Sequence, residues 1–470
     1  MEANPNPSSS VKARFFSWPF SWRGTRRALI GFIVLLTLVA IAYAEENWRG
    51  KRAWEHCKRE LESKGEVIDW HAYIPPPIPD EQNVFKAPKM TEWFVKGSGQ
   101  TTNTELSQHL SNPKTHSIIT NKEAAADYLA WSEQHATDFE IIREGLKRPF
   151  ARIDGDYNRP YAMARPHFVA IRDVVQTLAQ RARCYLVLRQ PENALRELSL
   201  IREMSGLLEG KPTGKPMTLV TAMINVAVTG LYADVVTDGL QSHAWREPEL
   251  IALEKQLRQI DLLPLLPESC RSERAAFCHA LEISKPSELV IMRELPASPL
   301  GWTYLNMANL ARMEQSAIDV FDSALGLVMP QKLEKFRRDV EKMQSGLQRY
   351  LPSTMMALIA LPNHARATKT VAGNQTKVNQ TRIVCALERY RLAHGEYPET
   401  FAALLPQFIE KLPPDIIGGQ PLKYRPTSDG KFLLYSIGWN EKDDGGVAER
   451  KKGTWDNQNT DDWVWGATVQ

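Results

Sequence analysis

The sequence predicts a mostly α-helical protein with an N-terminal transmembrane helix and a small α+β module at its C-terminal end. Three observations indicate this class. Residues 28–44 form an uncharged apolar run, ALIGFIVLLTLVAIAYA. Between residues 119 and 350, apolar side chains recur at three- and four-residue spacing, as on the faces of amphipathic helices. After residue 355, one long helical pattern leads into two short strand-like segments, LKYRPT and KFLLYSIG.

The composition limits the classes of function. The chain has 470 residues, of which 43% are apolar and 24% charged, which is enough for two or three ordinary folded domains. The net charge is only +3 and the basic residues are spread along the chain, so nothing indicates a nucleic-acid partner. The cysteines are sparse and form no CxxC motif, which predicts packed or free thiols at Cys57, Cys184, Cys270, Cys278 and Cys385.

The apolar run from Ala28 to Ala44 is expected to cross a membrane once. Its length is at the short end of the roughly 17–25 residues that a helical span needs. Basic residues precede the run, whereas Glu45 and Glu46 follow it directly. The positive-inside rule therefore predicts that residues 1–27 are a cytoplasmic basic and aromatic tail and that the bulk of the chain is exported.

A cleaved secretory signal is the alternative for this segment. Ala42, Tyr43 and Ala44 fit the small-x-small pattern of a signal cleavage site. The long N-terminal tail and the lack of a helix breaker before this site favour an anchor that is retained. Both interpretations place the residues after Ala44 outside the cytoplasm.

Residues 45–118 are expected to connect the span to the rest of the chain. They begin with a charged juxtamembrane helix that has Trp54, Cys57 and Leu61 at helical spacing. The segment YIPPPIPDEQNVFKAPKM follows. Its prolines disfavour helix, so we expect an extended spacer that is laid over a surface.

Residues 119–350 are expected to form an irregular α-hairpin domain. Asn121 is placed to cap its first helix, and short turns between helices favour antiparallel hairpins. Further helices are expected over 168–188, 191–208, 217–240 and 247–260. The piece RARCYLVLRQPENALRELSLI resembles one tetratricopeptide-like hairpin, in which the small residues Ala182 and Ala194 let two helices approach. No fixed period recurs, so a repeat array is not expected.

Residues 355–470 are expected to form the C-terminal α+β module. A helix over about 365–393 ends before Gly395, which suits a left-handed cap. Ser428, Asp429 and Gly430 are typical of a hairpin turn between the two strand-like segments. The module is therefore a long helix followed by a short antiparallel sheet.

Over about residues 365–465 the chain resembles the soluble part of the major pseudopilins of type II secretion. The resemblance lies in LERYRLAHGEYPET, in PLKYRPTSDGKFLLYSIG and in the acidic loop GWNEKDDGG. The whole architecture is also similar to a group of bacterial membrane-anchored proteins, which implies a bacterial inner membrane and a periplasmic body. Two departures argue against a pilus subunit. About 320 residues separate the anchor from the long helix, and Leu36 stands where prepilins have a glutamate.

The resemblance also implies a calcium site, because the corresponding loop of the major pseudopilins binds calcium. Calcium takes several oxygen ligands from a loop that can wrap around it. The candidate ligands are Asp443, Asp444, Asp461 and Asp462, near Asn440. Basic residues at 450–452 oppose a cation here, so a solvated acidic turn is the alternative.

The sequence contains no catalytic signature such as a phosphate-binding loop, HExxH or GxSxG. Cys278, His279 and Glu282 lie close together on one helical pattern, but no other ligands are seen to converge on them, so we expect ordinary packing. Glu273 stands beside Arg271 and Arg274 and is expected to form a structural charge pair.

These observations favour a protein that is not an enzyme. We expect a membrane-anchored extracytoplasmic scaffold or adaptor with an envelope protein as its partner, associated with a secretion or pseudopilus-like assembly. Two alternatives stay open. One is a hydrolase-type envelope enzyme whose acidic residues converge from different helices of the α-hairpin domain. The other is a structural module that calcium stabilises.

Overall fold

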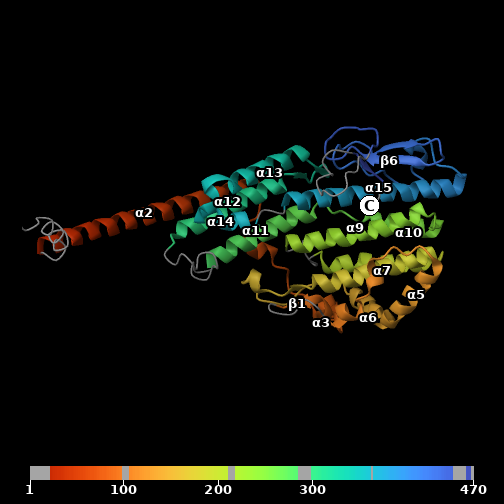
Figure 1. Cartoon of the computed structure of the whole chain (residues 1–470), viewed down its shortest axis with the longest axis horizontal. Coiled ribbons are helices and arrows are strands. Elements are labelled where there is room, and N and C mark those ends of the chain that lie inside the picture. Colours follow the sequence, from red (N-terminus) through yellow and green to blue (C-terminus); the bar gives the residue numbers. More distant parts are fainter. Residues whose placement is uncertain are drawn as a thin grey trace, which may run out of the picture.

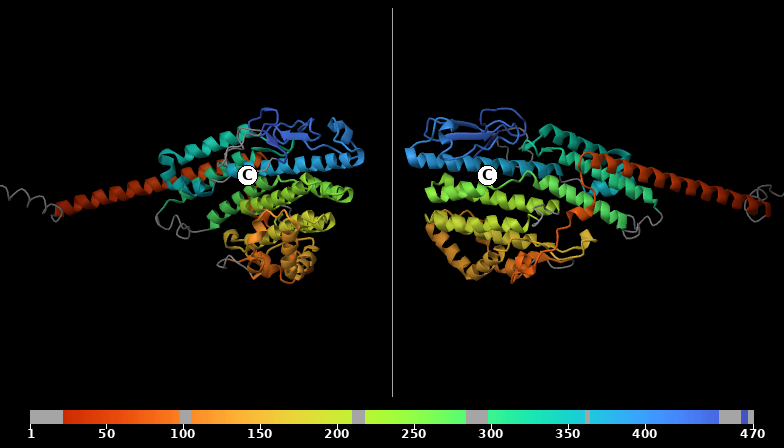
Figure 2. Two further views of the ribbon diagram at one scale, coloured as in Figure 1. Left: turned by 45° about the vertical axis from the view of Figure 1, so that its right-hand side comes forward. Right: turned by 180° about the vertical axis from the view of Figure 1, so that it is seen from behind.

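The computed structural model describes residues 22–97, 105–209, 218–283, 298–360, 364–447 and 462–466. Within these ranges the protein is mostly α-helical and carries short antiparallel sheets (Figure 1). The N-terminal helix α2 (Trp22–Ser63) projects from one end of an elongated body, and both further views agree (Figure 2). The mostly helical class and the N-terminal apolar helix are therefore confirmed.

Helix α2 has two halves with different surroundings. No part of its most apolar 18-residue stretch is buried, so the expected membrane segment lies outside the body. In the second half, Trp54, Cys57 and Leu61 are buried, as their spacing predicts, and they pack against α12 (Leu300–Ile318). Gly50 faces Gly301 where these two helices cross, so closely that a Cβ on either glycine would overlap the other helix's backbone.

The chain after α2 runs over the body in single turns. These are η2 (Trp70–Tyr73), η3 (Asp80–Gln82), η4 (Val84–Lys86), α3 (Met90–Phe94), α4 (Glu105–His109) and η5 (Pro113–His116). Strand β1 (Val95–Lys96) pairs with β2 (Arg165–Pro166). Trp70, Phe85 and Phe94 are buried, so the expected spacer closes one side of the helical body.

The next helices stack in layers below the C-terminal sheet (Figure 1). They are α5 (Lys122–Ser132), η6 (Glu133–His135), α6 (Ala136–Leu146), η7 (Pro160–Ala162), α7 (Phe168–Val187), α8 (Pro191–Met204), η8 (Ser205–Leu207), α9 (Leu219–Gln241) and α10 (Glu247–Arg258). Asn121 Oδ1 accepts from Ala124 N at 2.7 Å and caps α5, as expected. Ala182 and Ala194 are fully buried where α7 and α8 pack as a hairpin.

In the described part of the chain, helix α9 is, besides α2, the other helix that is long and apolar enough to cross a membrane. Unlike the apolar part of α2, 61% of its most apolar 18-residue stretch is buried inside the body. It packs against α7 on one side and α15 (His364–His394) on the other. These contacts are those of a core helix.

The remaining elements follow α10 along the chain. They are α11 (Leu265–Ile283), β3 (Phe321–Asp322), β4 (Leu327–Val328), α13 (Pro330–Gln344), η10 (Gly346–Tyr350), α14 (Pro352–Ala360), η11 (Phe401–Leu404), β5 (Lys423–Pro426), β6 (Phe432–Ser436) and β7 (Trp463–Val464). Strands β5, β6 and β7 form one antiparallel sheet in that order, with Tyr424 opposite Leu434. The turn between β5 and β6 has Gly430 at φ +75°, as the sequence predicts.

Helix α15 joins the two ends of the body. It contacts α9 and α10 on one side and β6 on the other, and Val371, Val378, Ile383 and Leu387 are buried. The largest hydrophobic core is continuous from the spacer, through α7 to α10, to the C-terminal sheet. The helix ends at His394, and Gly395 follows with φ +86°, the left-handed cap that was expected. All five cysteines are free and buried, as predicted.

Candidate functional site

The acidic C-terminal loop brings three of the four calcium candidates together, whereas Asp461 lies outside the described residues. Asp443 Oδ1 accepts from Tyr435 Oη at 2.9 Å and from Gly445 N at 3.1 Å. Lys423 Nζ lies 3.3 Å from its other oxygen. These hydrogen bonds, first that of Gly445, hold the pKa of Asp443 below its ordinary value. Asp443 is therefore already engaged by protein groups.

Asp462 is the most enclosed acid of this loop, with 3% of its surface exposed. Its Oδ2 accepts from Asp444 N at 3.1 Å and from Gly446 N at 2.7 Å. Burial nevertheless raises its pKa above the ordinary value. Its Oδ1 is buried and has no hydrogen-bond partner among the residues that the structure describes. One carboxylate oxygen is thus enclosed in the loop with no donor among the described residues.

The cluster Cys278, His279 and Glu282 does not converge. Cys278 is buried against Cys57 and Met307 at the contact of α2 with α12. The ring of His279 points to the other side, where it meets the ring of His71 edge-on, and Glu282 is exposed. Successive positions on one helix face different directions, and Cys278 packs in the core as the sequence led us to expect.

Glu273 is not the partner of Arg271 and Arg274, so that expectation was wrong. Both arginines bind Glu66 instead. Glu273 points away from them, and its Oε1 accepts from Leu219 N at 2.9 Å, at the start of α9. A helix N-terminus carries unpaired N–H groups, and here a carboxylate from a neighbouring helix satisfies one of them.

Glu273 also lines a cavity of about 170 Å³ between the spacer, the start of α9 and α11. The other lining side chains include Trp70, Tyr157, Met163 and Thr221. Burial, and then the charge of Glu314, raise the pKa of Glu273 to about 7, while the hydrogen bond from Leu219 N opposes that rise. Glu273 is therefore a carboxyl group with a pKa near neutrality in a mostly apolar cavity.

Behind Glu273, three helices bring Cys270, Glu314 and His364 together. Cys270 comes from α11, Glu314 from α12 and His364 from the first turn of α15. Their ligand atoms all lie within 4.8 Å of one another, and His364 Nε2 is 3.2 Å from Glu314 Oε2. The exposed fractions are 1%, 2% and 0%. In the described part of the chain this is the one group of three such side chains that could hold a metal ion.

An aromatic side chain packs against this cluster. The ring of Phe336 meets that of His364 edge-on, with 6.3 Å between centroids. Burial raises the pKa of the Cys270 thiol well above its ordinary value, and the neighbouring Glu314 carboxylate raises it further. No local pattern predicted the cluster, because its members stand at positions 270, 314 and 364 and converge only when the helices pack.

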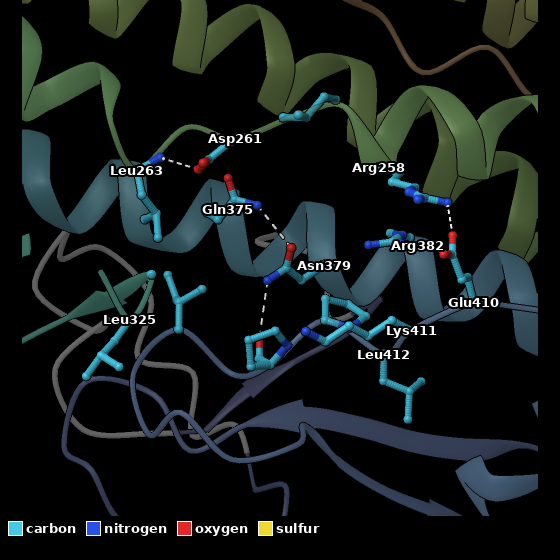
Figure 3. A pocket seen from close by; sticks show the side chains of 15 residues that line it. Arg258, Asp261, Leu263, Leu325, Gln375, Asn379, Arg382, Glu410, Lys411 and Leu412 are labelled. Carbon is cyan, nitrogen blue, oxygen red and sulfur yellow. Dashed lines mark hydrogen bonds and ion pairs between the residues drawn. The ribbon is translucent and has the colours of Figure 1, made fainter. Parts of the chain in front are cut away.

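A second cavity, of about 370 Å³, lies between α10, α15 and the segment before β5 (Figure 3). Gln375 donates to Asn379 Oδ1 at 3.0 Å, and Asn379 donates to Pro414 O at 3.2 Å. Arg258 pairs with Glu410 across the opening, as Figure 3 shows. These polar groups bind one another. They hold the segment before β5 against α15 and α10.

No protein-family model, no curated protein and no solved structure matches this chain. The functional argument therefore depends on the geometry of the anchor helix, the acidic loop and the buried cluster.

Proposed function

We propose that this protein is a single-pass scaffold or adaptor of the bacterial inner membrane, with a cytoplasmic N-terminus and a periplasmic body. The observation that carries this proposal is the continuity of α2. One helix exposes the apolar segment 28–44 and then inserts Trp54, Cys57 and Leu61 into the body. A body fastened in this way is held at a fixed position above the membrane, which suits a protein that presents a surface to a partner.

The same geometry supports an anchor that is retained. The possible cleavage site after Ala44 lies in the middle of α2, which continues without a break to Ser63. Residues just after it are engaged with the body. Asn47 Oδ1 accepts from Gly301 N at 2.8 Å, and Glu46 Oε2 accepts from Trp302 Nε1 at 3.2 Å. The intact mass of the protein from the membrane fraction tests this, since cleavage leaves a chain that begins at Glu45.

The C-terminal module supports an association with a secretion or pseudopilus-like assembly. Its long helix and short sheet are the parts that carry the pseudopilin resemblance. Here α15 is buried between α9, α10 and β6, so it is not available to pack in a fibre. The outer strand β5 instead exposes Lys423 and Arg425 at an edge of the sheet. Edge strands are common sites of association.

Cross-linking in intact cells, purification in mild detergent and mass spectrometry test the adaptor function. Deleting residues 355–470 would remove α15 from the core, so a surface substitution is the sharper probe. We expect Arg425→Glu on β5 to lose secretion or pilus-assembly components that the wild type recovers. Lys255→Glu, exposed on α10, is the matched control and should keep them. Recovery of the wild-type protein alone, or only with itself, would overturn the proposal.

Calcium stabilisation of the C-terminal loop is a second candidate function, and the enclosed Oδ1 of Asp462 favours it. A calcium ion would be a positively charged partner for this oxygen. Asp444, Asp461 and backbone carbonyls would be its further ligands. Calcium should then raise the Tm of the wild type relative to chelator and leave that of Asp462→Asn unchanged. Asp429→Asn, in the exposed hairpin turn, should respond as the wild type does. Equal Tm values for the wild type with calcium and with chelator would remove this candidate.

A hydrolase-type enzyme is the alternative from a different class, and Glu273 in its cavity is the observation that favours it. A carboxyl in an apolar enclosure is suited to exchange protons with a bound substrate. Ester, amide and phosphoester reporter substrates test it, with Glu273→Gln as the variant. Turnover by the wild type that the variant loses would favour the enzyme, whereas no turnover by either would favour the scaffold.

A further inference from the structure

We propose that Cys270, Glu314 and His364 bind one divalent metal ion of the borderline-soft class, with zinc as the type ion, inside the helical body. Three helices supply one ligand each, and all three side chains are almost completely buried. This site lies apart from the acidic C-terminal loop, and it does not depend on the adaptor function.

The donor set fits this class of ion. Zinc in proteins is bound by thiolate sulfur, imidazole nitrogen and carboxylate oxygen at about 2.0–2.3 Å. Ligand atoms around one tetrahedral ion are then roughly 3.3–3.7 Å apart. The 3.2 Å between His364 Nε2 and Glu314 Oε2 is close to this range, and Cys270 lies within the same 4.8 Å group. The three donor atoms therefore already lie close to the separations that one ion requires.

Charge balance gives an independent reason. A thiolate and a carboxylate contribute two negative charges, and a neutral imidazole contributes none, so a divalent ion neutralises the charge of its own three ligands. Neutral sites are the ones that a water-free interior tolerates. The nearby cation Arg274 does not perform this role, because it is bound to Glu66 and Gln315. Without metal the thiol keeps its proton, and metal binding would release it.

The position of the cluster between three helices indicates how a bound ion would affect the fold. Helix α12 packs on the anchor helix α2, α15 carries the C-terminal sheet, and α11 contacts both α12 and α9. An ion held by α11, α12 and α15 ties the anchored end of the body to its C-terminal end. The three protein ligands leave one position of a four-coordinate ion, as in zinc sites that hold water or a substrate. Glu273, one turn after Cys270 on α11, lines the adjacent cavity.

Metal analysis of the full-length protein in detergent tests the proposal. We expect about one zinc ion per chain after purification without chelator. Chelator should remove the ion and lower the Tm, and added zinc should restore it. Cobalt is the decisive probe, because thiolate coordination gives a charge-transfer absorption that a hydrogen-bonded thiol does not.

Single substitutions assign the ligands. Cys270→Ser should lose the cobalt charge-transfer band, and His364→Gln should lose the bound metal. Cys278→Ser is the matched control, since Cys278 is equally buried on α11 but packs against Cys57. If the ligand variants do not fold, the cobalt spectrum of the wild type still decides. A wild type that retains no zinc and shows no charge-transfer band with cobalt would overturn the proposal, and the cluster would then be a buried ion pair of His364 and Glu314 beside a thiol.

Discussion

Glu66, three residues after the end of α2, lies 2.6 Å from Arg274 on α11, and Arg274 has no exposed side-chain surface. Arg271 joins the same carboxylate at 3.0 Å, and Gln315 on α12 binds both Glu66 and Arg274. The end of the anchor helix is therefore fixed to two core helices by a buried polar network.

Breaking this network should destabilise the whole body. Glu66→Gln leaves the Arg274 guanidinium buried without its counter-charge, and such losses cost about 3–5 kcal/mol. Thermal unfolding of the detergent-solubilised protein should show a large fall in Tm. Glu60→Gln is the control, because Glu60 pairs with Lys64 on the exposed face of α2 and should change stability by less than about 1 kcal/mol. Equal Tm values for the two variants would contradict the prediction.

The same carboxylate predicts a pH dependence. Burial alone raises the pKa of Glu66, but the hydrogen bonds and charges of Arg271 and Arg274 outweigh it and leave the pKa below its ordinary value. The unfolded state then takes up the proton first, so the stabilisation is complete above a pH of roughly 4.3 and is lost as the pH falls through the lowered folded-state pKa. The Tm difference between wild type and Glu66→Gln should be constant near neutrality and shrink in acid. A difference that grows in acid would refute this.

The crossing of α2 and α12 should not tolerate a side chain. A Cβ at Gly301 would overlap the carbonyl oxygen of Glu46, and backbone cannot move aside as a flexible side chain can. Gly301→Ala should therefore lower stability by about 1–3 kcal/mol, as overpacking does. Gly31→Ala, on the partner helix α2, meets no atom within 4 Å and should leave the Tm of the body unchanged. Differential scanning fluorimetry of both variants checks this.

The stability of the α7–α8 hairpin should depend on the forked guanidinium group of Arg181. Its Nε and one terminal nitrogen donate to Glu197 Oε1 at 3.1 and 3.0 Å, and its other terminal nitrogen donates to Ser132 Oγ at 2.6 Å. A lysine keeps the charge but cannot reach all these acceptors. Arg181→Lys should lower the Tm clearly, whereas Arg172→Lys on the exposed side of α7 should not. An Arg181→Lys variant with the same Tm and the same rate of proteolysis as the wild type would show that the positive charge alone suffices.

Elements with a local cause could be predicted from the sequence. The spacing of Trp54, Cys57 and Leu61 gave the buried face of α2, and Asn121 gave the start of α5. Gly395 and Gly430 gave a helix end and a hairpin turn, because each occupies a positive φ that other residues avoid. These features depend on residues a few positions apart, and that is the range over which sequence patterns carry information.

Other features depend on helices that are distant in sequence. Glu273 was expected to pair with its chain neighbours, yet it turns to the start of α9 while Glu66 takes both arginines. The direction of a helical side chain is fixed by position, but its partner is fixed by which helix packs there. The buried group of Cys270, Glu314 and His364 is of the same kind.

The sequence by itself determined a helical protein with one exposed apolar segment at its start and a helix, hairpin and acidic loop at its end, because periodicity, charge and turn residues are local. Only the tertiary structure decided that α2 continues into the core, that α15 lies at its centre and that three ligand-type side chains meet in the interior. Those outcomes follow from the packing of complementary helix faces, and no spacing along the chain encodes them.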